Sequence, residues 1–194
     1  MQSITVFCGS NFGFSEEYRK LTVELAQEIV RRNLRLVYGG ANRGLMGVLA
    51  DAVISAGGQV KGIMSRGLFD KGHLHPQVHD FEVVDTLRQR KSLLTEYADM
   101  FLALPGGLGT FDELFEVLSL IQLGEQSKAC GILNVRGFFD PLLGLLANTI
   151  KEGFMKQEHM SMLVVESTPA AALNALHLWK APVVYKWFDD KHPS

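Results

Sequence analysis

Short runs of apolar residues alternate along the chain with longer segments in which apolar residues recur every three or four positions. The short runs are apolar almost throughout, which is typical of strands buried on both faces of a parallel sheet. They cover residues 4–9, 34–39, 59–64, 81–85, 100–104, 130–135 and 162–166. The longer segments have the period of helices, and they cover residues 15–32, 44–58, 86–98, 111–124, 140–153 and 168–179.

Residues at the ends of the helical segments support these boundaries. Ser15 and Thr168 are placed to act as N-caps, and Pro169 follows Thr168 at the first helical turn. Gly57 and Gly58 suit a helix C-terminus. Strands that alternate with helices predict a parallel sheet covered on both faces. We therefore predict an α/β fold with a Rossmann-like, doubly wound parallel sheet of about seven strands and helices on both faces.

Length, composition and charge narrow the class of protein. The 194 residues suit one domain, which we expect to cover residues 1–188, with residues 189–194 as a flexible tail. A chain with 47% hydrophobic and 21% charged residues is expected to be globular, and a net charge of −2 gives no polycationic surface for nucleic acid. No targeting signal is visible, and no apolar run reaches the roughly 18 residues of a membrane span. We expect a cytoplasmic protein without a nucleic-acid or membrane partner.

Residues that often bind metals or stack on bases have simpler explanations here. Cys8 and Cys130 lie in apolar runs without metal-like spacing, which predicts free buried thiols. Three histidines lie close together, but their spacing matches no standard metal site, so we expect a solvated loop; they are His73, His75 and His79. Trp179 and Trp187 are expected to pack near the C-terminus. We therefore predict no metal.

Glycine-rich turns follow three of the predicted strands. In a doubly wound sheet, ligands bind beyond the carboxyl ends of the strands. A bare backbone at a helix N-terminus presents free N–H groups and the positive end of the helix dipole, which suits a phosphate, and Thr110 adds a hydroxyl. Three such turns at one edge favour an anion or nucleotide site over tight turns alone, while Ser10 either contacts the ligand or caps its turn. The glycines concerned are Gly9, Gly39, Gly40, Gly44, Gly47, Gly106, Gly107 and Gly109.

Known nucleotide and nucleophile fingerprints do not fit these turns. The chain has no GxxxxGK[ST] P-loop and no GxSxG nucleophile elbow. A GxGxxG motif that starts at Gly107 would need a glycine where Asp112 stands. A carboxylate there would oppose the close approach of a pyrophosphate, so binding of NAD or FAD is disfavoured.

Two groups of charged residues flank the last glycine turn. Asp112 and Glu113 are expected in the first turn of the helix that follows it, where complementing the helix dipole would be the simple explanation. Arg88, Arg90 and Lys91 fall in the first turns of another helix, where cations oppose the dipole. A solvated basic face is one explanation of this run. Our hypothesis is that this helix starts beside the strand with the glycine turn, where one cation meets a ligand phosphate and another meets Asp112 or Glu113.

The segment Pro105-Gly106-Gly107-Leu108-Gly109-Thr110-Phe111-Asp112-Glu113 resembles the PGGxGTxxE motif of the LOG family. These proteins are cytokinin riboside 5′-monophosphate phosphoribohydrolases, often mislabelled as lysine decarboxylases. The resemblance covers nearly the whole chain in order and includes Val6–Ser10, Tyr38–Gly47, Arg90-Lys91, Gln122–Gly124 with Lys128, and Gly137–Leu143. It implies hydrolysis of the N-glycosidic bond of nucleoside 5′-monophosphates such as AMP, in cytokinin biosynthesis or nucleotide salvage. It also implies no metal, no cofactor, and a homodimer with the active site near the interface.

The resemblance assigns roles to individual residues. The backbone from Gly106 to Thr110 would hold the 5′-phosphate, with Ser10, Gly39 and Gly40 also on the substrate. Glu113 would be the catalytic carboxylate, with Asp112 as the other candidate, because an oxocarbenium-like state needs a nearby negative charge. Arg90 would orient the carboxylate or help the base to leave. Lys91 would neutralise the phosphate or hold the acidic pair.

The chain departs from the family pattern at several positions. It has Leu87-Arg88 where the family has Met-His, Ala41 where it has a third glycine, and Asp112 where glutamate is usual. The loop 66–80 does not align clearly with the segment that often contacts the base. These departures affect the identity of the base more than the phosphate site.

Two other functions remain as alternatives. One is a non-catalytic nucleotide- or molybdenum-cofactor-binding protein of the same superfamily, although two acids in the pocket would not help to bind an anionic cofactor. The other is a lysine decarboxylase, but neither Lys91 nor Lys128 lies in a recognisable context for a pyridoxal phosphate Schiff base.

Overall fold

The structure is a computed structural model that describes residues 1–182. The end of the domain expected at residue 188, the flexible tail expected for residues 189–194 and the packing expected of Trp187 lie outside the described residues. Within residues 1–182, no helix is long and apolar enough to cross a membrane. Cys8 and Cys130 are free and buried, as predicted.

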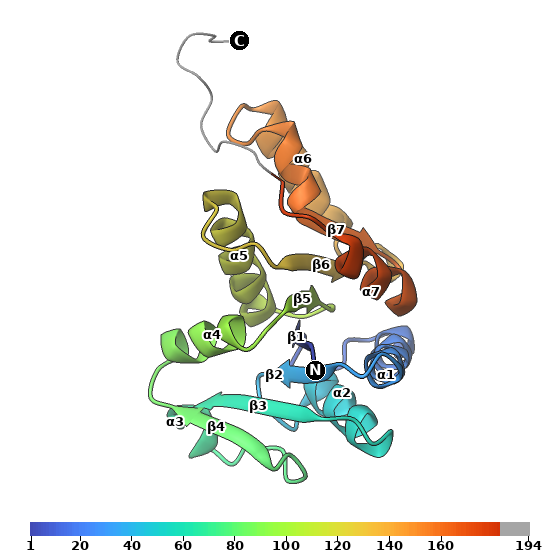
Figure 1. Ribbon diagram of the computed structural model, residues 1–194, viewed down its shortest axis with the longest axis vertical. Helices are drawn as coiled ribbons and strands as arrows, with labels where there is room; N and C mark the ends of the chain where they lie inside the picture. Colours follow the sequence, from blue (N-terminus) through green and yellow to red (C-terminus); the bar gives the residue numbers. More distant parts are fainter. Residues whose placement is uncertain (183–194) are drawn as a thin grey trace.

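One parallel sheet runs through the described part of the chain, with the strand order β4-β3-β2-β1-β5-β6-β7 (Figure 1). Each observed strand lies within two residues of the predicted run at either end, so the prediction of a doubly wound parallel sheet is confirmed. The strands are β1 (Ser3–Phe7), β2 (Arg35–Tyr38), β3 (Val60–Ser65), β4 (Asp80–Val84), β5 (Met100–Ala103), β6 (Ala129–Leu133) and β7 (Leu163–Glu166).

Helices cover both faces of this sheet (Figure 1). The long ones agree with the predicted segments, whereas the short α3, η1 and η2 are too brief to give a periodic signal. The helices are α1 (Glu16–Arg31), α2 (Gly44–Ser55), α3 (Arg66–Phe69), α4 (Leu87–Glu96), α5 (Leu108–Leu123), α6 (Asp140–Lys151) and α7 (Pro169–Leu178), with 3-10 helices η1 (Val135–Gly137) and η2 (Gln157–Met162).

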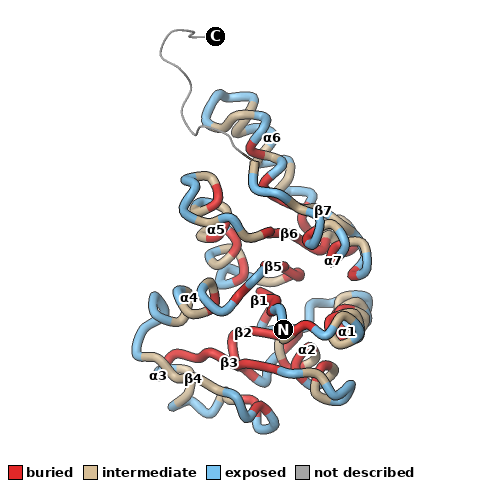
Figure 2. The backbone as a smooth tube through the Cα atoms, viewed as in Figure 1, coloured by how far each residue is buried: buried red, intermediate tan, exposed pale blue. Residues whose placement is uncertain are grey.

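The core forms two apolar layers, one on each face of the sheet. Ile4 and Val6 of β1 point into the layer shared with α1, α2 and α7. Phe7, of opposite parity on the same strand, points into the layer shared with α4 and α5. The central strands are therefore buried along their length (Figure 2). Each fully buried large apolar side chain contributes on the order of 1.5–3 kcal/mol to folding.

The chain reverses its direction of winding at β1. The strands that follow β1 are added on one side of it up to β4, and then the chain returns to place β5 on the other side. Connections that leave β1 and β5 therefore diverge and open a crevice above their carboxyl ends, where doubly wound proteins bind ligands.

The path of α4 corrects one expectation. Because β4 is the edge strand, α4 does not start beside β5, the strand with the glycine turn. It starts at the edge with a capping box between Thr86 and Gln89, in which Gln89 N–H donates to Thr86 Oγ1 over 3.2 Å. It then runs back across β3 towards β5, and this crossover carries its basic residues to α5.

Candidate functional site

The turns after β1 and β5 meet at the carboxyl ends of these strands, where the chain reverses its direction of winding. The N–H of Gly9 donates to the Pro105 carbonyl over 3.1 Å, and the Gly9 carbonyl accepts from Leu45 N–H at the start of α2 over 3.0 Å. A cavity of about 270 Å³ opens between these turns, with Ser10 and Gly107 in its lining. The two glycine turns and the first turn of α2 therefore form one concave backbone surface.

The three glycines after β5 differ in what surrounds them. A methyl group at Gly106 would lie 2.1 Å from Thr110 Oγ1 and 2.9 Å from Gly9 N, so packing within the protein requires glycine there. Thr110 is buried against this glycine. At Gly107 and Gly109, by contrast, nothing lies within 4 Å of the missing methyl group. The fold does not require those two glycines, and both leave bare backbone at the open N-terminus of α5.

The glycines after β2 are explained by contacts within the protein. A methyl group at Gly39 would lie 2.1 Å from Nη2 of Arg90, so this glycine makes room for the guanidinium. Gly40 has φ +78°, and a methyl group there would meet the ring of Phe81 at 2.7 Å. Gly39 thus makes room for Arg90 and Gly40 for Phe81, while Ser10 is exposed and lines the cavity.

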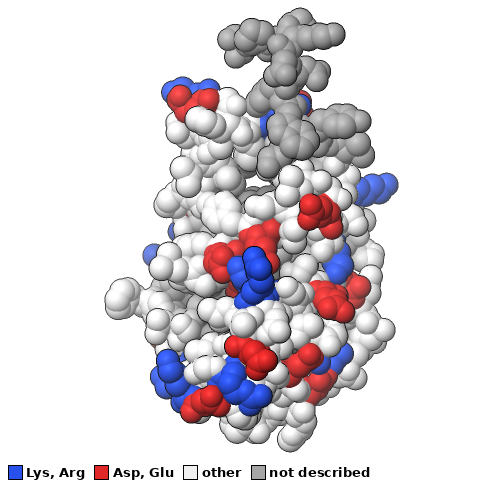
Figure 3. All heavy atoms as spheres, turned by 90° about the vertical axis from the view of Figure 1, so that its left-hand side faces the viewer, with Lys and Arg blue, Asp and Glu red and all other residues white. Residues whose placement is uncertain are grey.

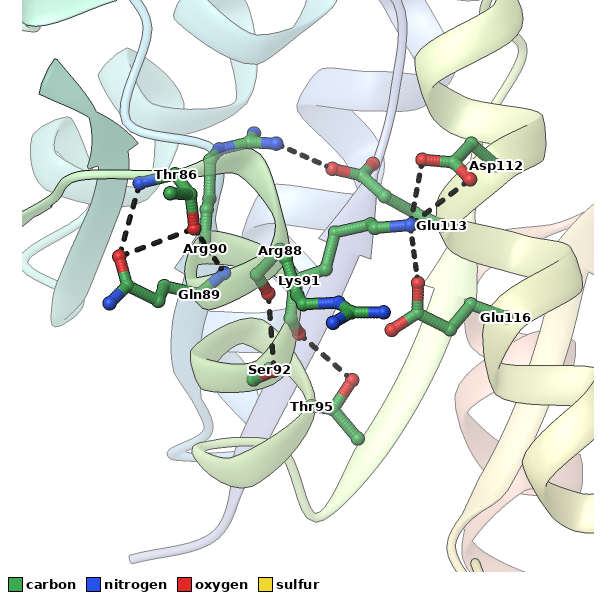
Figure 4. A network of polar contacts seen from close by, with 10 residues as sticks. All are labelled: Thr86, Arg88, Gln89, Arg90, Lys91, Ser92, Thr95, Asp112, Glu113 and Glu116. Atoms are coloured by element: carbon green, nitrogen blue, oxygen red, sulfur yellow. Dashed lines mark hydrogen bonds and ion pairs between the residues drawn. The ribbon is translucent and has the colours of Figure 1, made fainter.

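Arg90 and Glu113 form a largely buried ion pair between α4 and α5 (Figure 4). The guanidinium donates from Nη1 to Glu113 Oε1 over 2.8 Å and from Nε to the Ile63 carbonyl over 3.0 Å. The two side chains are only 12% and 11% exposed. Burial raises the pKa of Glu113 above its usual range, and the charge and hydrogen bond of Arg90 oppose that rise. The carboxylate is thus held in one orientation and is easier to protonate than an ordinary glutamate.

Lys91 joins the same two helices on the outer side of this pair. Its Nζ lies 3.0 Å from Asp112 Oδ2 and 2.5 Å from Glu116 Oε2 (Figure 4). The hydrogen bond to Glu116 raises the pKa of Lys91 above its usual range. Sequence analysis missed Glu116, although its spacing of four from Asp112 places both acids on one face of a helix. Basic and acidic side chains lie together on this face of the molecule (Figure 3).

The start of α5 corrects the simple explanation of the acids. The helix begins at Leu108, so Asp112 and Glu113 lie in its second turn, and its first turn holds no acid. The dipole effect falls off within the first turn, so it does not account for these residues. The part of our hypothesis in which a cation meets an acid is confirmed, because Arg90 reaches Glu113 and Lys91 reaches Asp112.

The loop 66–80 differs from the solvated loop that we expected. His75 is only 1% exposed, and its Nε2 lies 3.1 Å from Asp51 Oδ1 on α2. The neighbouring backbone is pinned to the turn after β2, since Asn42 N–H donates to the His73 carbonyl over 2.9 Å and His75 N–H to the Gly40 carbonyl over 3.1 Å. In residues 1–182, no group of three acidic, histidine or cysteine side chains is placed to hold a metal.

Comparisons with known proteins identify relatives of this chain. Residues 46–176 match the family described as "Possible lysine decarboxylase". The chain is 40% identical over 187 residues to cytokinin riboside 5′-monophosphate phosphoribohydrolase LOG5 of Arabidopsis thaliana, a match that covers 96% of this chain and 79% of that protein. It is 38% identical over 173 residues to a probable cytokinin riboside 5′-monophosphate phosphoribohydrolase, LOGL2, of Oryza sativa subsp. japonica. This match covers 89% of this chain and 71% of that protein.

Solved structures show the same fold at lower identity. A molybdenum cofactor binding protein from Rippkaea orientalis superimposes with a TM-score of 0.68 at 20% identity, over 91% of this chain and 95% of that one. The Moco carrier protein from Chlamydomonas reinhardtii gives 0.68 at 18% identity, over 91% and 95%. These likenesses establish the fold alone. The family match and the identity of about two in five residues to several phosphoribohydrolases show more: this chain belongs to the LOG family.

Proposed function

We propose that this protein hydrolyses the N-glycosidic bond of adenosine 5′-monophosphates, with or without a modified N6, to release the free base and ribose 5-phosphate. One observation carries the proposal. A single helix, α5, presents bare glycine backbone at its N-terminus and the buried Glu113 in its second turn. Glu113 lies four positions after Gly109, which is about 6 Å along the helix axis. We call the bare backbone of Gly106, Gly107 and Gly109 the glycine cradle. A phosphate bound there would bring the ribose beside the carboxylate.

The proposed reaction follows from how the phosphate and the ribose of the substrate are bound. Backbone N–H groups of Gly106, Gly107 and Gly109 bind the 5′-phosphate, and Ser10 adds a hydroxyl at the rim. As the bond from the anomeric carbon to the base breaks, positive charge develops on the ribose, and the Glu113 carboxylate stabilises it. Water attacks the same carbon and gives one proton to Glu113, while the base leaves with the bonding electron pair and takes up a proton from solvent. Glu113 then releases its proton to solvent, which restores the carboxylate.

The neighbouring charges support Glu113 in this role. Arg90 holds the carboxylate in one orientation and opposes the rise in its pKa that burial causes. Asp112 is exposed and bound to Lys91, so we assign it to ordering α4 against α5 or to the ribose hydroxyls rather than to proton transfer. Gly39 acts indirectly, by leaving room for the guanidinium of Arg90, whereas Gly40 leaves room for the ring of Phe81 and Thr110 packs against Gly106.

The two alternatives are less well supported. A protein that only binds an anionic cofactor would gain nothing from two acids in its site, Asp112 and Glu113. A lysine decarboxylase needs a lysine free to form a Schiff base. Lys91 Nζ is held by two carboxylates, and Lys128 Nζ donates to the Thr95 carbonyl over 2.9 Å.

We also propose that the protein is a homodimer with the site near its interface. Large apolar side chains are exposed around the carboxyl edge of the sheet, which is unusual unless another surface covers them. Leu87 and Leu108, at the starts of α4 and α5, are 60% and 87% exposed, and Phe14 in the loop before α1 is fully exposed.

The direct test is chromatography of the purified protein after incubation with AMP and with isopentenyladenosine monophosphate. We expect free base and ribose 5-phosphate in equal amounts, and the ratio of the two rates identifies the preferred base. Nucleotides that stay intact but bound would instead favour a binding protein. Light scattering on the same preparation is expected to give the mass of two chains, and the mass of one chain would contradict the dimer.

A Gly109→Ala variant tests whether the open cradle is reserved for the substrate. The methyl group meets no protein atom, and alanine in a helix is favoured over glycine by roughly 0.5–1 kcal/mol, so the free energy of unfolding should rise. The same methyl group would occupy the phosphate site, and we expect KM for AMP to rise at least about tenfold, the equivalent of one lost hydrogen bond. Gly144→Ala on α6, where the added methyl also meets nothing, is the matched control and should stabilise without changing KM. An unchanged KM in the Gly109 variant would place the phosphate elsewhere.

A further inference from the structure

A second cavity lies between α5, α6 and η2, away from the glycine cradle. Its volume is about 100 Å³. Most of its lining is apolar and comes from Phe115, Leu118, Leu146, Met155, Met160 and Met162. Its wall on α5 begins at Phe115, and no residue that we place in the candidate active site lines it.

One buried polar atom lies in this apolar lining without a partner. His159 lines the cavity and is only 2% exposed. Its Nδ1 accepts from the backbone N–H of Lys156 over 3.3 Å and lies 3.3 Å from the side-chain amide of Gln122. Its Nε2 has no hydrogen-bond partner among the residues that the structure describes. An unsatisfied buried donor is unfavourable, and native proteins rarely leave one.

The protonation state of the His159 ring determines which kind of partner its Nε2 lacks. Because Nδ1 accepts a hydrogen bond, the proton of the neutral ring lies on Nε2. Burial, with the charge of Lys156 as a second cause, lowers the pKa of His159, so the ring is neutral at physiological pH. His159 therefore offers the cavity one N–H donor and no positive charge. A neutral acceptor suits it better than an anion.

The mostly apolar lining suits an organic guest better than a water molecule, which would meet carbon atoms on most sides. Buried waters make about three hydrogen bonds, and a stable one needs at least two polar partners. Apart from Nε2 of His159, the polar side chains in the lining are those of Ser119 and Gln122, and the amide nitrogen of Gln122 is engaged with Nδ1 of His159. The thioethers of Met155, Met160 and Met162 are flexible and polarisable, which suits an apolar guest of variable shape.

We propose that this cavity is a binding site for a small uncharged carbonyl compound, whose oxygen accepts a hydrogen bond from Nε2–H of His159 and whose apolar body packs against the methionines. A cavity of this order holds a ring-sized molecule. The inference is independent of the proposed hydrolysis, because it concerns a different cavity and a different class of ligand.

The test uses cyclohexanone and methylenecyclohexane, which have nearly the same shape but differ in the acceptor oxygen. Long-range proton–nitrogen spectra of the full chain with labelled histidines report on His159 directly. We expect the ketone to shift the Nε2 resonance and to bind about two- to tenfold more tightly than the hydrocarbon, as one neutral hydrogen bond allows. His159→Leu should remove that preference while the hydrocarbon still binds.

A second variant keeps the test decisive if His159→Leu fails to fold. Leu146 lies on α6 and is only partly buried. Leu146→Trp should fill the cavity and abolish binding of the ketone. Equal binding of ketone and hydrocarbon by the wild-type protein would overturn the role of His159. An unshifted Nε2 resonance at saturating ketone would overturn the site itself, and would point to water or to a second copy of the chain as the occupant.

Discussion

A Glu113→Gln variant is expected to lower kcat for AMP by about 10²- to 10⁴-fold, the range that a positioned general base contributes, with KM changed far less. Glutamine has almost the same shape and can still accept the hydrogen bond from Arg90. It cannot carry the negative charge that stabilises the ribose cation or take the proton from water. Steady-state kinetics of base release, with a thermal melt to show that the variant is folded, measure this effect.

Asp112→Asn is the matched control, since it removes the charge from the adjacent residue on the same helix. Asp112 is exposed and paired with Lys91, which keeps a second partner in Glu116. We expect kcat to fall by less than about tenfold, because an exposed ion pair contributes little. If Asp112→Asn abolished turnover and Glu113→Gln did not, the two assignments would have to be exchanged.

An Arg90→Gln variant is expected to lower kcat by about 10- to 100-fold, as loss of a charged hydrogen bond allows, and to move the acid limb of the pH profile to higher pH. Burial raises the pKa of Glu113, and Arg90 opposes that rise. Without the guanidinium the pKa rises further, so a larger fraction of the carboxylate is protonated and inactive at a given pH. The loss should therefore be greatest at acid pH and should diminish as pH increases. The measurement is kcat/KM against pH.

Two further variants separate this effect from a general loss of structure. Gly39→Ala places a methyl group 2.1 Å from Nη2 of Arg90 and should displace the guanidinium, which shifts the acid limb in the same direction. Arg35→Gln breaks an ion pair with Asp80 at the amino ends of β2 and β4, whereas the site lies at the carboxyl ends of the strands. This variant should leave the acid limb of the pH profile unchanged. An acid limb that stays in place in both the Arg90 and Gly39 variants would mean that it does not report on Glu113.

The order of buried strands and amphipathic helices was predictable from the sequence, because the period of apolar residues is a local property. Every strand and long helix lies near its predicted position. The same holds for the glycine turns at one edge of the sheet. Parallel strands place their carboxyl ends together, so turns far apart in the sequence become neighbours once the strands are assigned.

What sequence alone left open is which side chains meet across elements. The path of α4 from the edge strand back to β5 decides that Arg90 pairs with Glu113 and Lys91 with Asp112 and Glu116. Burial then separates two adjacent acids, since Glu113 faces the sheet and Asp112 faces solvent. Such differences depend on atoms contributed by several strands and helices.

The glycines show most clearly the difference between what the sequence predicts and what the tertiary structure decides. By sequence, those after β2 and β5 form equivalent turns at the ligand edge. The tertiary structure assigns Gly39 to the guanidinium of Arg90, Gly40 to the ring of Phe81 and Gly106 to Thr110. It leaves only Gly107 and Gly109 of this set facing open space. The sequence thus determined the fold, the edge of the sheet and the family of this protein, because periodicity and motif are local. Packing between distant segments decided which of its residues face a substrate, because that depends on what occupies the space beside each backbone atom.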